Sequence, residues 1–476
     1  MTQSFQSVAL LVGSLIGVGG AAYAQPPDIV GSDSEGNTAM GGFVLQAVAN
    51  GGFNTGAGDG ALQSDNSGYL NTAVGFQALT LNSSGYGNTG IGYVLWRNTV
   101  GNNNTATGVY ALLNNTTANN NTATGAYSLV NNTTGGGNTA SGFNSLHNNG
   151  VANYNTATGM NALCGNTTGS YNTAAGAFAL AGGDPQNVFP FPTCPASTGD
   201  DNTATGAQAL TSNTEGSNNT ASGAGSLYSN TNGASNTASG NHALYYNTTG
   251  FHNTATGAEA IFSNTSGTIN TAVGFGALFS NTNGSNNIAV GNDAGYNLTH
   301  GANNIDIGNE GVAGEGGQIR IGTAGTQTAT YIAGIENAKV TGAAVYVTSS
   351  GQLGVLASSE RYKTAIAPMG GATEKLQELR PVTFHLKTDL NGPVQYGLIA
   401  EEVASVYPEL VIRDQAGKIQ GVRYEELAPM LLNEVQKQQQ VNLVQAAKIL
   451  SLEQQLAGIQ AALVKLQPKD DLVAQR

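Results

Sequence analysis

The chain has 476 residues, which is too long for one compact core and allows two to four domains. Charged residues make up only 9 % of it, against about a quarter in ordinary globular proteins. The formal net charge of −13 gives no basic footprint for nucleic acid. From Gln25 to Gln318 the only Lys or Arg is Arg97. This distribution argues against a uniform globular enzyme and predicts an extended neutral segment followed by a different, charged module.

The N-terminus carries a candidate export signal. An apolar run from Val8 to Val18 is followed by Gly19-Gly20 and by the small-residue motif Ala22-Tyr23-Ala24. We therefore expect a signal peptide at 1–24, cleaved after its last residue, and a secreted or cell-surface protein. No later stretch approaches the roughly 20 apolar residues that a membrane helix needs, so we expect no membrane span after cleavage.

The two cysteines, Cys164 and Cys194, fit an exported protein with one disulfide. Two free buried thiols are the alternative. Two cysteines and five scattered histidines make no metal site, so we expect neither a metal nor a cofactor.

Up to about residue 310 the chain repeats a unit that reads Asn-Thr-Ala-x-Gly-x-x-Ala-Leu-x-x-Asn-Thr-x-Gly-x-x. Successive units are 17 residues apart, except for one step of 16 and one of 30, which carries 13 extra residues including Cys194. Since this insertion leaves the phase intact, it is a loop extruded from one coil, and Cys164 lies one coil earlier. The first Asn of each unit is Asn37, Asn54, Asn71, Asn88, Asn104, Asn121, Asn138, Asn155, Asn172, Asn202, Asn219, Asn236, Asn253, Asn270, Asn287 and Asn304.

Asn, Thr and Gly form helices poorly, so this period is not a helical solenoid. Short extended segments between Gly and Asn turns favour a parallel β-solenoid or β-roll over residues 37–318, after a linker at 25–36. Leu at the ninth position predicts an internal ladder, and Asn at the twelfth position, from Asn82 to Asn281, predicts an Asn ladder at the turn. Sixteen coils at roughly 4.8 Å each give a rod of about 75 Å.

The orientation of the Asn-Thr-Ala strand is inferred from variation within the chain. The last units read Asn-Ile-Ala-Val-Gly and Asn-Ile-Asp-Ile-Gly, followed by Ile319-Arg320-Ile321. Because Ile and Val replace the second and fourth positions, we expect the Thr positions to face the interior and the Ala positions to face outward or toward a neighbouring chain. Thr-x-Thr rows on a solenoid also suggest an ice-binding plane, and an inward Thr row excludes that function.

The repeat loosely resembles the β-roll heads of trimeric autotransporter adhesins, which also stack short Asn/Ser-x-Ala-x-Gly units. Those adhesins end in an outer-membrane β-barrel, whereas this chain ends in Gln-rich, helix-forming sequence. The ligand of the rod stays open, because we expect no aromatic row or charged patch to repeat in register. Cell-surface or extracellular carbohydrate or protein are the candidate partners.

The composition changes after Gln318, and we expect a β neck at 319–357. An ordered series of motifs follows: Ala357-Ser358-Ser359-Glu360-Arg361-Tyr362-Lys363, Leu379-Arg380-Pro381-Val382, Gly397-Leu398-Ile399-Ala400-Glu401-Glu402-Val403, Pro408-Glu409-Leu410-Val411 and Val422-Arg423-Tyr424. The series resembles the intramolecular chaperone auto-processing domain of phage tailspikes and endosialidases. We place this domain, a small α+β fold, at 358–430.

The resemblance implies a catalytic dyad formed by a Ser that opens the domain and a Lys five residues later. Ser358 and Lys363 match both positions, and the implied scissile bond is Ala357–Ser358. Ser359 stands where the family often has Asp, which leaves a second serine beside the first. A serine hydroxyl needs a base within hydrogen-bond reach, and a lysine serves only when burial keeps it neutral. An ordinary surface pair is the alternative.

From about Glu425 the pattern becomes helical, and a coiled coil is predicted at 431–467, with a tail at 468–476. Its apolar residues follow the 3-4 spacing of a coiled-coil seam; the alternative is one amphipathic helix folded back on the domain. The seam consists of Ile449, Leu452, Leu456, Ile459, Leu463 and Leu466.

Taken together, the sequence predicts a secreted, homotrimeric, adhesin-like fibre whose C-terminal chaperone drives trimerisation and then cleaves itself once. The trimer is implied by the resemblance, because mixed Ile and Leu in the seam does not fix the strand number. The alternative is a phage-type tail fibre or carbohydrate-binding spike whose chaperone cap is not cleaved. Turnover of an external substrate is not expected.

Overall fold

The computed structural model describes residues 31–183, 194–333, 335, 341–348, 350–414 and 416–466. The expected signal peptide at 1–24 and the tail at 468–476 lie outside these ranges. The chain forms two compact units, one ending at Thr330 and the other beginning at Tyr331. None of the helices within the described ranges is long and apolar enough to cross a membrane.

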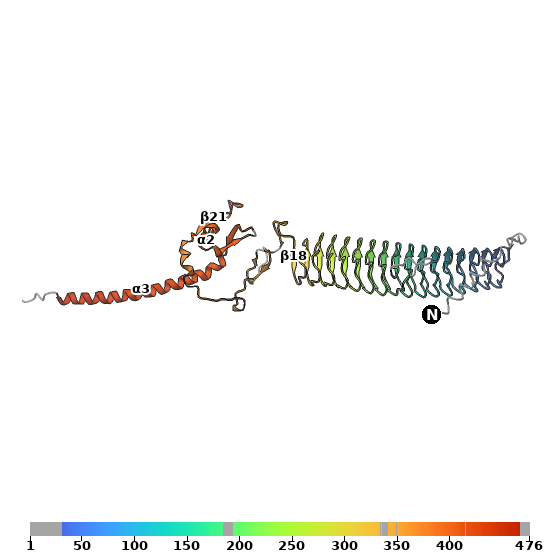
Figure 1. Cartoon of the computed structure of the whole chain (residues 1–476), viewed down its shortest axis with the longest axis horizontal. Coiled ribbons are helices and arrows are strands. Elements are labelled where there is room, and N and C mark those ends of the chain that lie inside the picture. Colours follow the sequence, from blue (N-terminus) through green and yellow to red (C-terminus); the bar gives the residue numbers. More distant parts are fainter. Residues whose placement is uncertain are drawn as a thin grey trace, which may run out of the picture. The chain divides into compact units, whose positions relative to one another are not determined.

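The first unit is a parallel β-solenoid with one three-residue strand per repeat, which confirms the predicted architecture (Figure 1). Neighbouring strands pair in register, so that Thr122 lies beside Thr139 and Ala123 beside Ala140. A short strand β1, Gly31–Ser32, pairs antiparallel with the first repeat strand. The parallel strands are β2 (Thr38–Met40), β3 (Thr55–Ala57), β4 (Thr72–Val74), β5 (Thr89–Ile91), β6 (Thr105–Thr107), β7 (Thr122–Thr124), β8 (Thr139–Ser141), β9 (Thr156–Thr158), β10 (Thr173–Ala175), β11 (Thr203–Thr205), β12 (Thr220–Ser222), β13 (Thr237–Ser239), β14 (Thr254–Thr256), β15 (Thr271–Val273), β16 (Ile288–Val290), β17 (Ile305–Ile307) and β18 (Ile319–Ile321).

The glycine that follows each strand ends it for a steric reason. Gly125, for example, has φ 126°, and a Cβ at this position would lie 2.6 Å from the carbonyl oxygen of Gly142 on the next coil. Only glycine tolerates both the positive φ and this close approach of two backbones. The repeated Gly therefore sets the corner of the coil.

The last strand lies beyond the expected boundary of the solenoid. Ile319 pairs in parallel with Ile305, and Arg320 with Asp306, so β18 is a further strand of the same sheet. The expected β neck at 319–357 is therefore wrong at its first residues. The cause is a step of 14 residues between β17 and β18, which breaks the period without breaking the stack.

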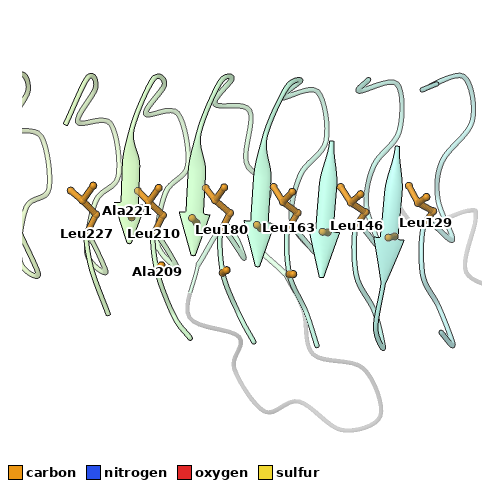
Figure 2. Close-up of a cluster of buried hydrophobic side chains, with 14 of the residues drawn as sticks. Leu129, Leu146, Leu163, Leu180, Ala209, Leu210, Ala221 and Leu227 are labelled. Atoms are coloured by element: carbon orange, nitrogen blue, oxygen red, sulfur yellow. The ribbon is translucent and has the colours of Figure 1, made fainter. Parts of the chain in front are cut away.

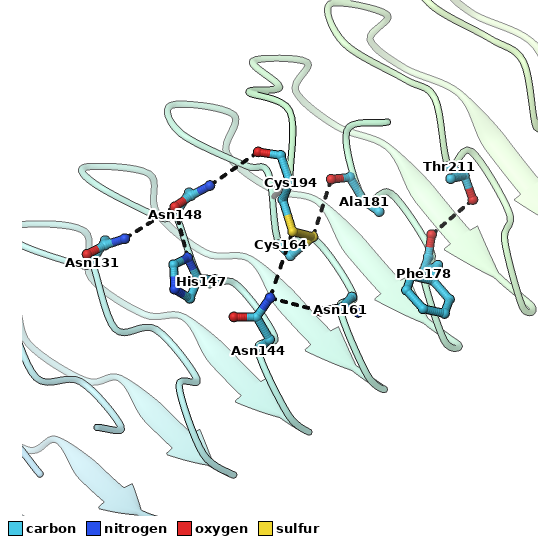
Figure 3. Close-up of a disulfide and its surroundings, with 10 residues drawn as sticks. All are labelled: Asn131, Asn144, His147, Asn148, Asn161, Cys164, Phe178, Ala181, Cys194 and Thr211. Atoms are coloured by element: carbon cyan, nitrogen blue, oxygen red, sulfur yellow. Dashed lines mark hydrogen bonds between the residues drawn. A yellow bond between two sulfur atoms is a disulfide. The ribbon is translucent and has the colours of Figure 1, made fainter. Parts of the chain in front are cut away.

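The insertion leaves the stack intact, and a disulfide holds its far end. Cys164 and Cys194 are bonded, with 5.7 Å between their Cα atoms (Figure 3). Beyond the insertion Ser197 pairs with Asn166, and β11 then pairs in register with β10. The side-chain amide of Asn148 donates to the carbonyl oxygen of Cys194 at 3.5 Å. The bond thus ties the returning chain to the coil that precedes the insertion.

The interior of the solenoid is a ladder of leucines, as the sequence predicts. Side chains such as Leu129, Leu146 and Leu163 lie one above another on successive coils and are essentially inaccessible to solvent (Figure 2). Each is packed against the alanines of its own and neighbouring coils. This continuous core, rather than helix or strand propensity, holds the coils together.

The expected orientation of the strands is wrong. In β7 the side chain of Ala123 is fully buried, whereas Thr122 and Thr124 are exposed, and the same alternation runs along the stack. The physical reason is space: the strand lies close to the wall that carries Leu, and only a small side chain fits between them. Because the Thr rows face outward, their orientation does not exclude an ice-binding plane.

The asparagines form two ladders, of which the sequence analysis predicts only one. At the twelfth position, the Asn247 amide donates to Asn230 Oδ1 at 2.8 Å and to the Gly250 carbonyl at 3.0 Å. At the first position, the Asn71 backbone N–H donates to Asn54 Oδ1 at 2.9 Å. Both rows are buried. Each amide satisfies backbone groups at a corner where no strand partner reaches them.

A row of stacked rings also repeats in register, so the expectation of no aromatic row is wrong. Tyr228, Tyr245, Phe262, Phe279 and Tyr296 occupy the tenth position of five successive units. Their neighbouring ring centroids are 4.9 to 5.4 Å apart, with interplanar angles of 4 to 14°. Since each inner ring covers the faces of its neighbours, the row presents edges rather than faces. It stabilises the stack and does not offer a platform for a sugar ring.

The second unit is a small α+β region followed by a long helix (Figure 1). Its core is small and contains six buried side chains: Val403, Tyr407, Leu410, Val411, Val422 and Met430. Its elements are β19 (Tyr346–Val347), β20 (Leu353–Gly354), the 3₁₀ turns η1 (Glu360–Tyr362), η2 (Gly370–Glu378) and η3 (Pro408–Leu410), β21 (Val382–Phe384), β22 (Gln395–Gly397), α2 (Ala400–Val406), β23 (Val411–Arg413), β24 (Ile419–Val422) and α3 (Tyr424–Leu466).

Candidate autoprocessing site

The candidate nucleophile and base lie on either side of one short helical turn. Ser358 precedes Ser359, which is extended and caps η1. Lys363 follows η1, is also extended, and donates its backbone N–H to the Glu360 carbonyl at 2.9 Å. The five-residue spacing between Ser358 and Lys363 therefore spans a single turn between two extended residues.

A single chain does not assemble these residues into a dyad. The side chains of Ser358 and Lys363 are both exposed. Within the described ranges, no hydrogen bond joins the Ser358 hydroxyl to the Lys363 amine. A lysine acquires the free lone pair of a general base through burial, and this burial is absent in one chain. The burial that Lys363 needs is therefore not supplied by the single chain.

The neighbouring serine is equally accessible. Ser359 is exposed and its side chain makes no capping hydrogen bond to η1. Its carbonyl accepts the backbone N–H of Tyr362 at 3.0 Å. Exposure and local geometry therefore do not distinguish the two serines, and the choice of Ser358 depends on the spacing to Lys363.

The motifs that are separate in the sequence meet around the small core. Arg380 forms an ion pair with Glu402 on α2, with 2.6 Å between Nη2 and Oε1. The Arg423 backbone N–H donates to the Leu410 carbonyl at 2.8 Å. The hydroxyl of Tyr424 accepts the backbone N–H of Leu398 at 2.8 Å. The last four motifs of the series thus meet in one folding unit, whereas the residues of the first motif, 357–363, are exposed.

Gly397 is required for this arrangement. A Cβ at Gly397 would lie 2.6 Å from the Tyr424 hydroxyl oxygen and 3.1 Å from a ring carbon of Phe384. Both distances are shorter than side chains tolerate without a shift of the neighbours. The glycine therefore lets the start of α3 close against β21 and β22.

A polar cluster that the sequence analysis missed joins η2 to α3. Thr373 is buried, and its hydroxyl contacts Glu434 and accepts the Asn433 amide at 2.6 Å. Lys437 donates to Glu434 at 2.8 Å, and this hydrogen bond, together with that of Thr373, lowers the pKa of Glu434. The contact fixes the first turns of α3 on the domain. No local sequence motif predicts this cluster, since Thr373 and Asn433 are far apart in the sequence.

Beyond these contacts the seam of α3 has no partner in the described part of the chain. The six seam residues from Ile449 to Leu466 are between 53 and 79 % exposed. The described contacts of α3 with the domain come from its first turns, where Tyr424 contacts Leu398, Met430 enters the core and Asn433 contacts η2. The alternative of a helix folded back on the domain therefore fails, and the apolar stripe remains open.

The two ends of the solenoid each carry a buried carboxylate. Asp306 is inaccessible to solvent, and both its oxygens lack a hydrogen-bond partner in the described part of the chain. Burial, and then the nearby Glu315 carboxylate, raises its pKa to about 6, partly offset by Arg320. Burial likewise raises the pKa of Asp65 to about 6. At the C-terminal end, Arg320 forms an ion pair with Glu315.

Fold and motifs together define a fibre-like β-solenoid followed by a folding module. Residues 358–412 match the model of the Peptidase_S74 family, described as chaperone of endosialidase. The chain thus carries a Peptidase_S74 intramolecular chaperone domain near its C-terminus, as the resemblance implied. No curated protein matches the chain.

Proposed function

We propose that this protein is an exported, homotrimeric, adhesin-like fibre whose C-terminal module aligns three chains and then cuts the Ala357–Ser358 bond. The observation that carries the trimer is the open seam of α3. Six apolar side chains at 3-4 spacing lie on the helix α3 and are more than half exposed. Burying a leucine or isoleucine contributes roughly 1.5–3 kcal/mol. Association of α3 with the helices of other chains is therefore favourable, because it buries these side chains.

The number of chains comes from the matched family, since Peptidase_S74 chaperone domains typically form trimers. A trimer also supplies what the candidate site lacks. In one chain Ser358 and Lys363 are exposed, whereas packing of three chains around the 3₁₀ turn η1 would bury the lysine and keep its amine neutral. Cleavage would then wait for correct assembly.

The reaction needs no external reactant except water. The neutral Lys363 amine takes the proton from the Ser358 hydroxyl, and the oxygen attacks the carbonyl carbon of Ala357. The Ser358 nitrogen leaves with a proton, so the peptide bond becomes an ester. Water then hydrolyses the ester to give a carboxylate at Ala357 and a free amine at Ser358. The cut occurs once per chain.

The module would act before the rod is complete. A solenoid has only neighbour contacts between coils, and bringing three chains into register is slow and aggregation-prone. A C-terminal trimeriser raises the effective concentration of the three strands. Cleavage afterwards removes the route back to the aligned state and gives the fibre kinetic stability.

The test is a panel of three variants of the full chain, purified without added protease and read by intact mass. The wild type yields fragments 25–357 and 358–476. Ser358→Ala and Lys363→Ala stay uncut and keep the native trimer mass, because each change removes one reacting group. Ser359→Ala is the matched control and is cut like the wild type. Cleavage of Ser358→Ala, or loss of cleavage in Ser359→Ala alone, contradicts the assignment.

A further inference from the structure

The outward face of the solenoid sheet is chemically uniform. We call the side chains at the first and third residues of strands β2–β18 the strand face. Along these strands they are Thr, Ser, Ala, Val, Ile and Met, and none carries a charge. The Ala, Gly, Asp or Arg between them faces the opposite way. A surface of this length without a charged or long polar side chain is unusual for solvent-exposed protein, and depletion of charge is typical of the centre of an interface.

The strand face becomes fully apolar toward its C-terminal end. In β16 and β17 the exposed residues are Ile288, Val290 and Ile307, each about two-fifths exposed. In β18 they are Ile319 and Ile321, which are 68 and 72 % exposed. The row thus presents β-branched aliphatic side chains on successive strands, and such a continuous exposed patch marks a binding surface.

Two occupants fit a flat β-branched array. Ordered water fits the Thr-x-Thr rows, since strands lie about 4.8 Å apart and second neighbours in a tetrahedral water lattice are about 4.5 Å apart, given an O···O hydrogen bond of about 2.75 Å. The aliphatic strands decide against it, because the face continues unbroken from Thr rows into Ile and Val rows that offer water no hydrogen bond. A second copy of the chain fits both parts.

The dimensions fit the same occupant. Seventeen strands at about 4.8 Å and three residues at about 3.3 Å give a face of about 80 by 10 Å. This is about 800 Å² per chain, which equals what one partner contributes to a specific, stable interface. The apolar end also lies nearest in sequence to the chaperone module, where three chains would first be aligned.

We propose that the strand face is the surface through which the solenoids of the trimer pack on one another. The apolar strands β16–β18 associate first, and the Thr rows follow. The inference rests on the proposed trimer and adds where the rods touch. The outward Thr rows then lie between chains and do not meet an external ligand.

The test uses single cysteines introduced into the full chain. The described residues hold no free cysteine, because Cys164 and Cys194 are bonded, so an introduced thiol reports on its own site. Thr124→Cys lies on the strand face. Thr134→Cys is the matched control, since it is also an exposed Thr and belongs to the same coil. Maleimide labelling is measured on the native trimer and on the unfolded chain.

We expect Thr124→Cys to react about tenfold or more slowly than Thr134→Cys in the native particle, and equally in the unfolded chain. Equal native rates in a particle that light scattering identifies as a trimer would overturn the strand-face interface and leave the proposed function intact. A monomeric particle would contradict both the strand-face interface and the proposed trimer. A second pair, Val290→Lys against the neighbouring exposed Asn292→Lys, gives an independent result: only Val290→Lys is expected to lower the melting temperature of the rod, and equal effects overturn the inference.

Discussion

The solenoid and the C-terminal module bury their apolar side chains in different ways. In the solenoid, coil after coil places a fully buried leucine against alanines, and two asparagine ladders satisfy the corners. In the described part of the module the apolar core contains six buried side chains, while the six seam residues of the helix α3 remain exposed. The solenoid thus has a core within one chain, whereas the exposed seam of the module is available for other chains.

The largest effect is expected from a charge in the open seam. Leu456→Glu places a carboxylate at a position that is buried between helices in the proposed trimer. Desolvation of this carboxylate would cost more free energy than burial of the apolar seam contributes. We expect the native mass, measured by light scattering, to fall from three chains to one. Gln454→Glu is the control, because it lies on the opposite side of the helix. A trimer in both variants would contradict the role of the seam.

The next effect is expected in the solenoid core. Leu210→Ala removes a fully buried side chain and leaves a cavity, which costs about 2–5 kcal/mol. Leu81→Ala is the matched control, since Leu81 is 39 % exposed, and its cost should be well below that of Leu210→Ala. Because the core lies within one chain, the loss for Leu210→Ala should not depend on protein concentration. Thermal unfolding followed at two concentrations checks both points.

The asparagine ladders predict a smaller loss. In Asn247→Asp the side chain no longer donates to Asn230 Oδ1 and to Gly250. The Gly250 carbonyl keeps its hydrogen bond from Asn236, whereas the buried Asn230 Oδ1 loses its donor, at about 1–3 kcal/mol. Asn131→Asp is the control, because Asn131 is exposed and its amide donates a single hydrogen bond of 3.2 Å, to Asn148, while its oxygen accepts one from Asn114. Equal melting temperatures of the two variants would show that the ladder adds no stability.

The smallest effect is a pH dependence at the ends of the solenoid. The folded pKa of Asp306 is about 6, above its ordinary value of 3.8, so the folded state binds the proton more tightly than the unfolded state. The contribution of Asp306 to stability is therefore fully present below pH about 4 and is lost as the pH rises to about 6. Asp306→Asn should match the wild type at pH 4 and exceed it at pH 7 by on the order of 1–3 kcal/mol. A difference that stays constant with pH contradicts the buried carboxylate.

The period, the leucine ladder and the phase-preserving insertion could be predicted because each follows from the spacing of one residue type. The facing of the strands could not, because alternation defines two faces without saying which one is buried. The sequence does hold a signal that decides it. Gly56 and Gly90 replace the strand Ala, and a Cβ on them would lie 2.4 Å from Val44 and 3.0 Å from Val94, where other coils have Ala or Ser. Such paired changes in size indicate contact.

The candidate site shows the opposite limit. The spacing of Ser358 and Lys363 and the series of motifs could be read from the sequence, because a family pattern is local. Their assembly could not, since the exposed lysine has no enclosing partner within the described part of the chain. The polar cluster around Thr373 was missed for a related reason: its members come from η2 and α3 and meet only in the fold.

The native mass of the purified wild-type protein, measured by light scattering at micromolar concentration, tests the central claim most directly. The account predicts a particle with the mass of three chains, because only association covers the seam of α3 and encloses Lys363. A particle with the mass of one chain, with the seam still exposed, would contradict it.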